Sequence, residues 1–159
     1  MDGFEEIKEI DYLQQNTMCY CVDYMPERVE NENFYEFEQY YLKRRINDFS
    51  EKIIDFVLKF IQYFTTKIFV TDALEVEGEI IEPGVDIRNM SLEKLEKVIS
   101  KIIINDKSSM QILIKEDEYS LVSVNGEFSV DIYNPTPKVF NICDKLISQE
   151  GLFIRKAFQ

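Results

Sequence analysis

The sequence predicts an α+β fold with a mostly antiparallel sheet, and three observations favour this class. Residues 109–134 alternate apolar and polar side chains in a pattern typical of a three-strand meander. Residues 34–64 carry a long apolar stripe at helical spacing, and residues 137–149 carry a second one. Because a bare three-strand meander is not stable without a cover, we expect these two helices to pack on its apolar face.

The meander is the best-defined part of the predicted fold. Its first and third strands are predicted from the alternating apolar residues Met110, Ile112, Ile114, Phe128, Val130 and Ile132. The pair Asn125-Gly126 tolerates positive φ angles and predicts a type I′ turn between the second and third strands. The acidic segment 116–118 is expected to form the corner between the first two strands.

The amino-terminal part predicts one short helix and one ambiguous segment. Residues 4–13 place Phe4, Ile7 and Leu13 at helix-like intervals, so we expect an amphipathic helix with its glutamates in water. Residues 18–24 are rich in residues that favour strands, and Pro26 ends the segment. This segment is either a strand or an irregular stretch.

The run from residue 34 to 64 predicts either one bent helix or two helices. Its main stripe recurs at alternating steps of four and three residues: Leu42, Ile46, Phe49, Ile53, Phe56, Phe60 and Tyr63. Phe34, Phe37 and Tyr41 follow a different phase, which predicts a break near residues 43–45. Such a stripe also occurs in coiled-coil dimers, so a homodimer through residues 42–63 is an alternative.

The remaining elements follow from local signals. Residues 67–71 predict a short strand, and residues 74–81 predict a second extended piece with Glu75, Glu77 and Glu79 on one side. Ser91 is suited to cap a helix over 92–102, and residues 152–154 predict a last strand. No linker or repeat is evident, so we expect a single globular domain over residues 1–159.

Composition excludes several classes of function. The chain has 18 Lys and Arg against 30 Asp and Glu, a formal net charge of −12, which repels nucleic acids and anionic membranes and favours a basic protein partner. It contains no histidine, which removes the commonest general base and zinc ligand. We therefore predict no enzyme activity, no catalytic residues, no metal site and no cofactor.

The three cysteines, Cys19, Cys21 and Cys143, are odd in number and lack zinc-site spacing. They are expected to be free thiols in a reducing compartment, and the absence of a signal peptide or an apolar run long enough to span a membrane favours a cytoplasmic protein.

Acidic clusters supply the candidate partner-binding residues. Three like charges on one face of a strand repel one another, and a basic partner would relieve that repulsion. The predicted contacts are Glu75, Glu77 and Glu79, followed by Glu116, Asp117 and Glu118. A second acidic cluster, residues 27–38, is flanked by Tyr20, Tyr24, Tyr35, Tyr40 and Tyr41, and tyrosine mixed with carboxylates is a suitable surface for a basic protein.

In general character the chain resembles the immunity proteins that bacteria carry beside secreted polymorphic toxins. The likeness rests on the acidic rows at 75–79 and 27–38, on the ending from Met110 to Ile154, and on a small, histidine-free α+β chain. The resemblance implies a non-enzymatic protein that neutralises a basic toxin domain by electrostatically steered docking. The alternatives are a self-associating structural or regulatory module that uses residues 42–63, and a hydrolase that uses carboxylates in a cleft.

Overall fold

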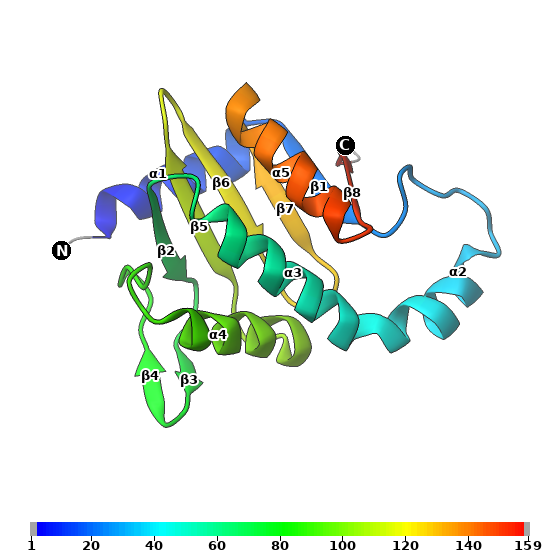
Figure 1. The fold of residues 1–159 in the computed structure, drawn as a ribbon, viewed down its shortest axis with the longest axis horizontal. Helices are drawn as coiled ribbons and strands as arrows, with labels where there is room; N and C mark the ends of the chain where they lie inside the picture. Colours follow the sequence, from blue (N-terminus) through cyan, green and yellow to red (C-terminus); the bar gives the residue numbers. More distant parts are fainter. Residues whose placement is uncertain (1–2, 158–159) are drawn as a thin grey trace.

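The computed structural model describes residues 3–157 and has the predicted α+β class, with a six-stranded antiparallel sheet and a small two-stranded one (Figure 1). The strands of the large sheet are arranged in the order β2-β5-β6-β7-β1-β8. Their bounds are β1 (Cys19–Asp23), β2 (Thr66–Val70), β5 (Met110–Lys115), β6 (Tyr119–Val124), β7 (Val130–Tyr133) and β8 (Phe153–Lys156). The ambiguous segment at 18–24 is therefore a strand, and it lies between β7 and β8.

Three helices cover one face of the sheet: α3 (Ile46–Phe60), α4 (Leu92–Asn105) and α5 (Pro137–Gln149). The predicted roofing of the meander is confirmed for α3, which is part of the predicted 34–64 run, and for α5, and α4 joins them in the same layer (Figure 1). Ser91 caps α4 and Thr136 caps α5, each accepting a hydrogen bond from the backbone N–H three residues later. The core is completed by fully buried side chains such as Phe56, Ile99 and Ile112.

The helix α1 (Phe4–Asn16) packs on the opposite face and covers only half of it. It buries Ile10 and Leu13 against Leu113 and Leu121, while Phe4 and Ile7, expected on the buried side, are exposed. Because α1 lies over β2, β5 and β6, the residues of β7, β1 and β8 on this face are partly buried or, at Phe153, exposed.

The meander is confirmed as β5-β6-β7, but the turn predicted at Asn125-Gly126 is wrong. Neither residue has a positive φ; the connection runs through Glu127, which does, and closes with the Asn125 N–H donating to Ser129 O at 2.9 Å. Gly126 is needed for another reason, since a Cβ there would lie 1.7 Å from Asp106 Oδ1. Contact with the end of α4 therefore determines this turn.

The long helical run is broken near the predicted place. It consists of α2 (Phe34–Phe37), a π-helical turn (Glu38–Leu42), a 3₁₀ turn (Lys43–Arg45) and then α3, which ends at Phe60. Of the stripe proposed for self-association, residues 42–63, the side chains of Phe49, Ile53, Phe56 and Phe60 are buried in this chain's own core, whereas Leu42 and Ile46 are partly buried and Tyr63 is exposed. The four buried side chains are therefore not available for a dimer interface in this fold.

The predicted extended piece at 74–81 is a hairpin, with β3 (Leu74–Val76) paired to β4 (Glu79–Ile81). Glu77 and Gly78 connect them with φ of 54° and 80°, the positive angles that a type I′ turn requires. Glu75 lies opposite Ile80 and Glu79 lies opposite Val76, so these two glutamates project from opposite faces. The prediction that three glutamates share one face is wrong.

Candidate functional site

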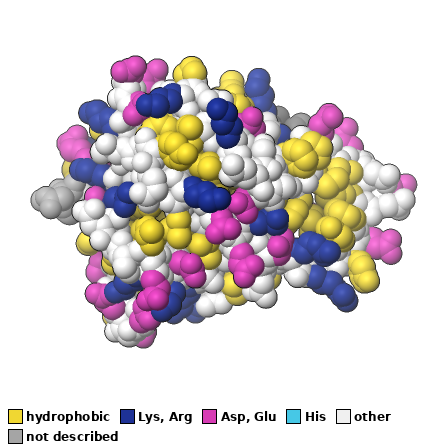
Figure 2. Space-filling view, in the orientation of Figure 1, with side chains coloured by type: hydrophobic (Ala, Val, Ile, Leu, Met, Phe, Trp, Pro, Cys, Tyr) yellow, Lys and Arg dark blue, Asp and Glu magenta, His cyan; other side chains and the backbone are white. Residues whose placement is uncertain are grey.

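Residues 24–45 form an arm that leaves the sheet after β1, extends away from the body of the molecule and returns into α3 (Figure 1). None of the residues from Phe34 to Arg45 is buried. Several of its aromatic rings face solvent, with Tyr35 68% and Tyr40 65% exposed. Figure 2 shows a group of hydrophobic side chains at the end of the molecule where the arm lies, with charged side chains around it.

Local contacts hold the arm in shape. Phe37 stacks on Phe34 and on Tyr41, with ring centroids 5.5 and 4.7 Å apart. The Arg45 guanidinium lies 3.5 Å from the centroid of Tyr41 and donates a hydrogen bond to the Tyr41 carbonyl at 2.8 Å. At the root of the arm the Tyr24 hydroxyl donates to Asp48 at 2.8 Å. The aromatic residues thus stabilise the arm mainly against itself.

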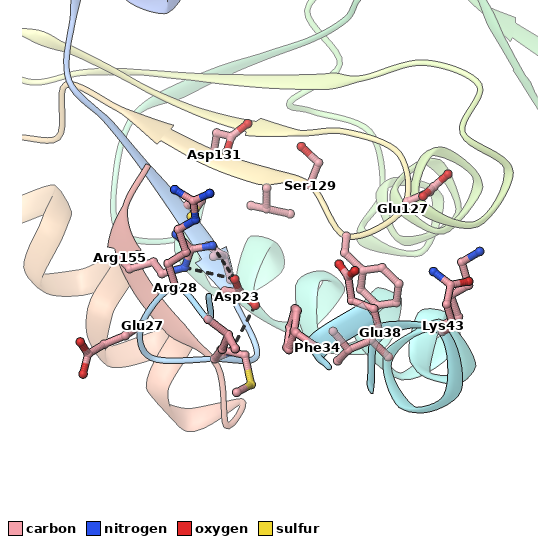
Figure 3. Close-up of a pocket in the computed structure, with 18 residues that line it drawn as sticks. Asp23, Glu27, Arg28, Phe34, Glu38, Lys43, Glu127, Ser129, Asp131 and Arg155 are labelled. Atoms are coloured by element: carbon pink, nitrogen blue, oxygen red, sulfur yellow. Dashed lines mark hydrogen bonds and ion pairs between the residues drawn. The ribbon is translucent and has the colours of Figure 1, made fainter. Parts of the chain in front are cut away.

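A cleft of about 620 Å³ lies between the arm and the end of the sheet (Figure 3). The arm contributes Phe34, Glu38 and Leu42, while the sheet and the loop before β7 contribute Asp23, Asp131, Arg155, Glu127 and Phe128. Its walls are therefore mixed, with aromatic and aliphatic surface beside charged groups. Burial in such a cleft strengthens electrostatic contacts, because the local dielectric is lower than that of water.

On its sheet side, the cleft is bordered by a row of residues that lie opposite one another on neighbouring strands, at the end of the row that α1 does not cover. Across the six strands this row is Phe69, Gln111, Ser123, Asp131, Cys21 and Arg155. The Gln14 side chain of α1 donates to Gln111 at 3.5 Å, so α1 covers the first part of the row. The remaining part, from Asp131 to Arg155, borders the cleft.

Two carboxylates in the cleft are in different electrostatic states. Asp23 accepts hydrogen bonds from Arg155 Nε and Nη2 at 3.1 and 2.8 Å, so its charge is balanced. Burial raises the pKa of Asp131, and a hydrogen bond from Ser129 only partly opposes this. No ion pair of Asp131 is found within residues 3–157. Asp131 is therefore a carboxylate held in the cleft without a balancing cation.

The neighbouring thiols are free, as predicted. Burial, and next the nearby Asp131 carboxylate, raise the pKa of Cys19 to about 11, and burial also raises the pKa of Cys21. Both thiols stay protonated at neutral pH, and a protonated thiol is a poor nucleophile and metal ligand.

The predicted contacts on the hairpin already have partners within the chain. Lys94 of α4 pairs with Glu79, and Lys97 pairs with Glu77 at 2.7 Å, which lowers the pKa of Glu77. Lys101, one turn further on, donates to the backbone carbonyl of Glu75. The lysines of α4 thus relieve the repulsion that a basic partner was expected to relieve.

The second set of predicted contacts, Glu116, Asp117 and Glu118, forms the corner between β5 and β6, as expected. Asp117 and Glu118 are exposed, and Glu116 lies 3.8 Å from Lys138. This corner and the β3-β4 hairpin lie at opposite ends of the sheet, so the structure does not bring the two predicted clusters together (Figure 1).

Sequence reasoning missed the cleft residues Asp23, Asp131 and Arg155. The alternation in β7 marks Asp131 only as a polar position, and its pairing with distant strands is not visible in a local pattern. A signal for the arm was present: the different phase of Phe34, Phe37 and Tyr41 showed that these rings do not continue the buried stripe of α3.

Comparison with protein-family models, curated proteins and solved structures gives no match to this chain. Within residues 3–157, no helix has the length and apolar character needed to cross a membrane.

Proposed function

We propose that this protein is a non-enzymatic binding protein that docks a basic protein domain against the arm and the adjoining cleft. The most specific form of the proposal is a cytoplasmic immunity protein of bacteria, which neutralises a basic toxin domain by occupying its surface. The single observation that carries the proposal is the projecting arm, which exposes Tyr35, Tyr40 and Tyr41 beside the glutamates of residues 27–38, with Arg44 and Arg45 lying over Tyr40 and Tyr41.

Two physical effects support this role. A net charge of −12 attracts a basic domain over a distance and raises the association rate. Exposed tyrosines then supply rigid contact area, the type of residue that carries much of the binding energy in protein interfaces. Residues 27–38 carry five glutamates and one arginine, so the outer part of the arm combines both properties.

The hairpin and the β5-β6 corner remain predicted contacts of lower rank. At the hairpin the glutamates face lysines of α4, so a partner would have to displace those pairs to gain the full interaction. Tyr35, Tyr40 and Tyr41 of the arm, in contrast, are exposed in the free protein. A partner can therefore cover Tyr35, the most exposed of these rings, without displacing an ion pair.

The proposal predicts that a basic domain is encoded beside the gene for this chain, and it is tested by titrating that domain in calorimetry at several salt concentrations; the absence of such a neighbour would refute the immunity form of the proposal. The double variant Tyr35→Ser/Tyr40→Ser is expected to weaken binding at least tenfold, a loss typical of interface aromatic residues. The matched control Glu75→Gln/Glu77→Gln is expected to weaken it less. Equal affinity for wild type and the tyrosine variant, or affinity that does not fall with salt, would refute the proposal.

One observation favours a second candidate, the carboxylate hydrolase, because a raised pKa in a cleft is also a property of a general acid. Hydrolysis by two carboxylates needs a second one that is not held in an ion pair; Asp23 is bound to Arg155, which leaves Glu27, Glu38 and Glu127 as the carboxylates of the cleft other than Asp131. We prefer the binding proposal because it also uses the exposed rings of the arm, which hydrolysis in the cleft leaves without a role. Self-association would need a surface other than the stripe buried within α3.

A further inference from the structure

The cleft is continuous with a second, apolar pocket on the same arm. This pocket, of about 260 Å³, is lined by Met25, Val29, Asn31, Asn33, Phe34 and Phe37. Three of these residues, Met25, Val29 and Phe34, also line the cleft. A segment lying across them would therefore place one side chain in the cleft and a neighbouring side chain in the apolar pocket.

The charges in the cleft select a cation. Its carboxylates are Asp23, Glu27, Glu38, Glu127 and Asp131, and its basic residues are Arg28, Lys43 and Arg155. Arg155 is bound to Asp23, which leaves more negative than positive charge for a ligand to meet. Figure 3 shows Asp131 on the sheet side and Lys43 on the arm side, with Arg28 and Arg155 near Asp23, and no ion pair joins Asp131 to any of these three within residues 3–157.

The walls favour arginine over lysine. Phe34 and Phe128 both line the cleft, and a planar guanidinium stacks on an aromatic ring while it donates hydrogen bonds to a carboxylate. An ammonium group lacks this flat face. The combination of ring and carboxylate is the chemistry that distinguishes the two cations.

We propose that the cleft binds an arginine side chain of the partner beside Asp131, and that the apolar pocket next to Phe37 binds the apolar side chain adjacent to it. This inference rests on the proposed function and specifies the docking segment: an exposed basic-apolar pair. The pKa of Asp131, raised by burial, is consistent with a carboxylate that lacks its cation in the free protein.

Short peptides test this directly on the full-length protein. Capped Gly-Arg-Leu-Gly, Gly-Lys-Leu-Gly, Gly-Arg-Ser-Gly and Gly-Gln-Leu-Gly are titrated while amide signals are followed by NMR. Gly-Arg-Leu-Gly is expected to shift the signals of Asp131 and Phe37 together. Loss of the arginine or of the leucine from the peptide is expected to raise the dissociation constant at least fivefold, and lysine in place of arginine is expected to raise it about threefold. Each of these changes corresponds to the loss of about one favourable contact.

Two variants and one control assign the effect to the pockets. Asp131→Asn keeps an acceptor for the Ser129 hydroxyl, and it is expected to reduce the affinity for the arginine peptide to that of the glutamine peptide. Phe37→Ala is expected to reduce it to that of Gly-Arg-Ser-Gly. Glu116→Gln, at the far corner, is expected to change nothing.

Shifts spread over the whole acidic surface and equal for all cationic peptides would overturn the inference, as would unchanged affinity of Asp131→Asn. If the intact basic domain binds through the arm but no peptide reaches the cleft, the inference fails and the proposed function stands. If the peptides bind in the cleft but no basic domain binds, the proposed function fails.

Discussion

The arm and the core should respond very differently to the same substitution, Phe→Ala. Phe56 of α3 is 0% exposed, and removal of a buried phenylalanine side chain costs about 3–5 kcal/mol of unfolding free energy. Phe37 contacts Phe34 and Tyr41, both in the arm, and each such ring pair contributes about 0.5–1.5 kcal/mol. Because these ring contacts lie within the arm, their loss destabilises the local structure of the arm and not the core. We therefore expect the global unfolding free energy to change by at most about 1 kcal/mol.

Urea unfolding followed by circular dichroism measures both variants. Phe56→Ala should lower the midpoint strongly, since domains have about 5–15 kcal/mol in total, whereas Phe37→Ala should leave midpoint and slope nearly unchanged. Hydrogen exchange should be faster in residues 34–45 than in α3 in the wild-type protein. A Phe37→Ala variant that loses as much stability as Phe56→Ala would refute the separation of arm and core.

Three further predictions concern single positions. Because burial raises the folded-state pKa of Asp131, the ionised carboxylate destabilises the fold above that pKa. Asp131→Asn should therefore be more stable than wild type at pH 7, by about 1.4 kcal/mol for each unit by which the pKa is raised. In a pH series of thermal unfolding, this difference in stability should vanish below the unfolded-state pKa. Gly126→Ala should lower the unfolding free energy in urea by about 1–3 kcal/mol, because the new Cβ would lie 2.9 Å from Asp106 Cα and would overlap the Asp106 carboxylate. Gly78→Ala meets no neighbouring atom within 4 Å and should lower it by only about 1 kcal/mol, for its positive φ. Equal losses for the two variants would contradict the close contact at Gly126. Cys143 is fully buried in α5, with a pKa raised by burial, so a maleimide should label it only after unfolding; rapid labelling of the native protein would contradict this packing.

The sheet and its helices could be predicted because their signals are local. In β5 and β7 the core face stays apolar at every second residue, and the helices α4 and α5 each begin at a hydroxyl cap. The order β7-β1-β8 could not be predicted, because nothing in residues 18–24 specifies which distant strands they will pair with.

The errors at the two turns have different physical causes. Alternation has the same period in one long strand and in a hairpin, so the row Glu75, Glu77 and Glu79 did not reveal the turn at Glu77-Gly78. At Asn125-Gly126 the local preference was overridden by packing against α4, where the Glu127 N–H donates to Ile103 O at 2.9 Å.

The candidate site was predictable only in part. The acidic cluster 27–38 and its flanking tyrosines pointed to the arm, but Tyr20 and Tyr24 pack against the core, so only Tyr35, Tyr40 and Tyr41 entered the proposal. The cleft depends on Asp131 and Arg155, which lie on β7 and β8 with β1 between them, so it exists only through the tertiary pairing of strands. A polar position in a strand looks the same in the sequence whether it faces bulk water or a cleft.

The position of β1 has a consequence for synthesis on the ribosome. This strand is made early, but both of its neighbours, β7 and β8, are made more than 100 residues later, as the pairing of Cys21 with Asp131 and Arg155 shows. Contacts of such large sequence separation form slowly and cannot form before both ends exist. The nascent chain therefore emerges with its arm unanchored, and the cleft is assembled only when β8 has been added.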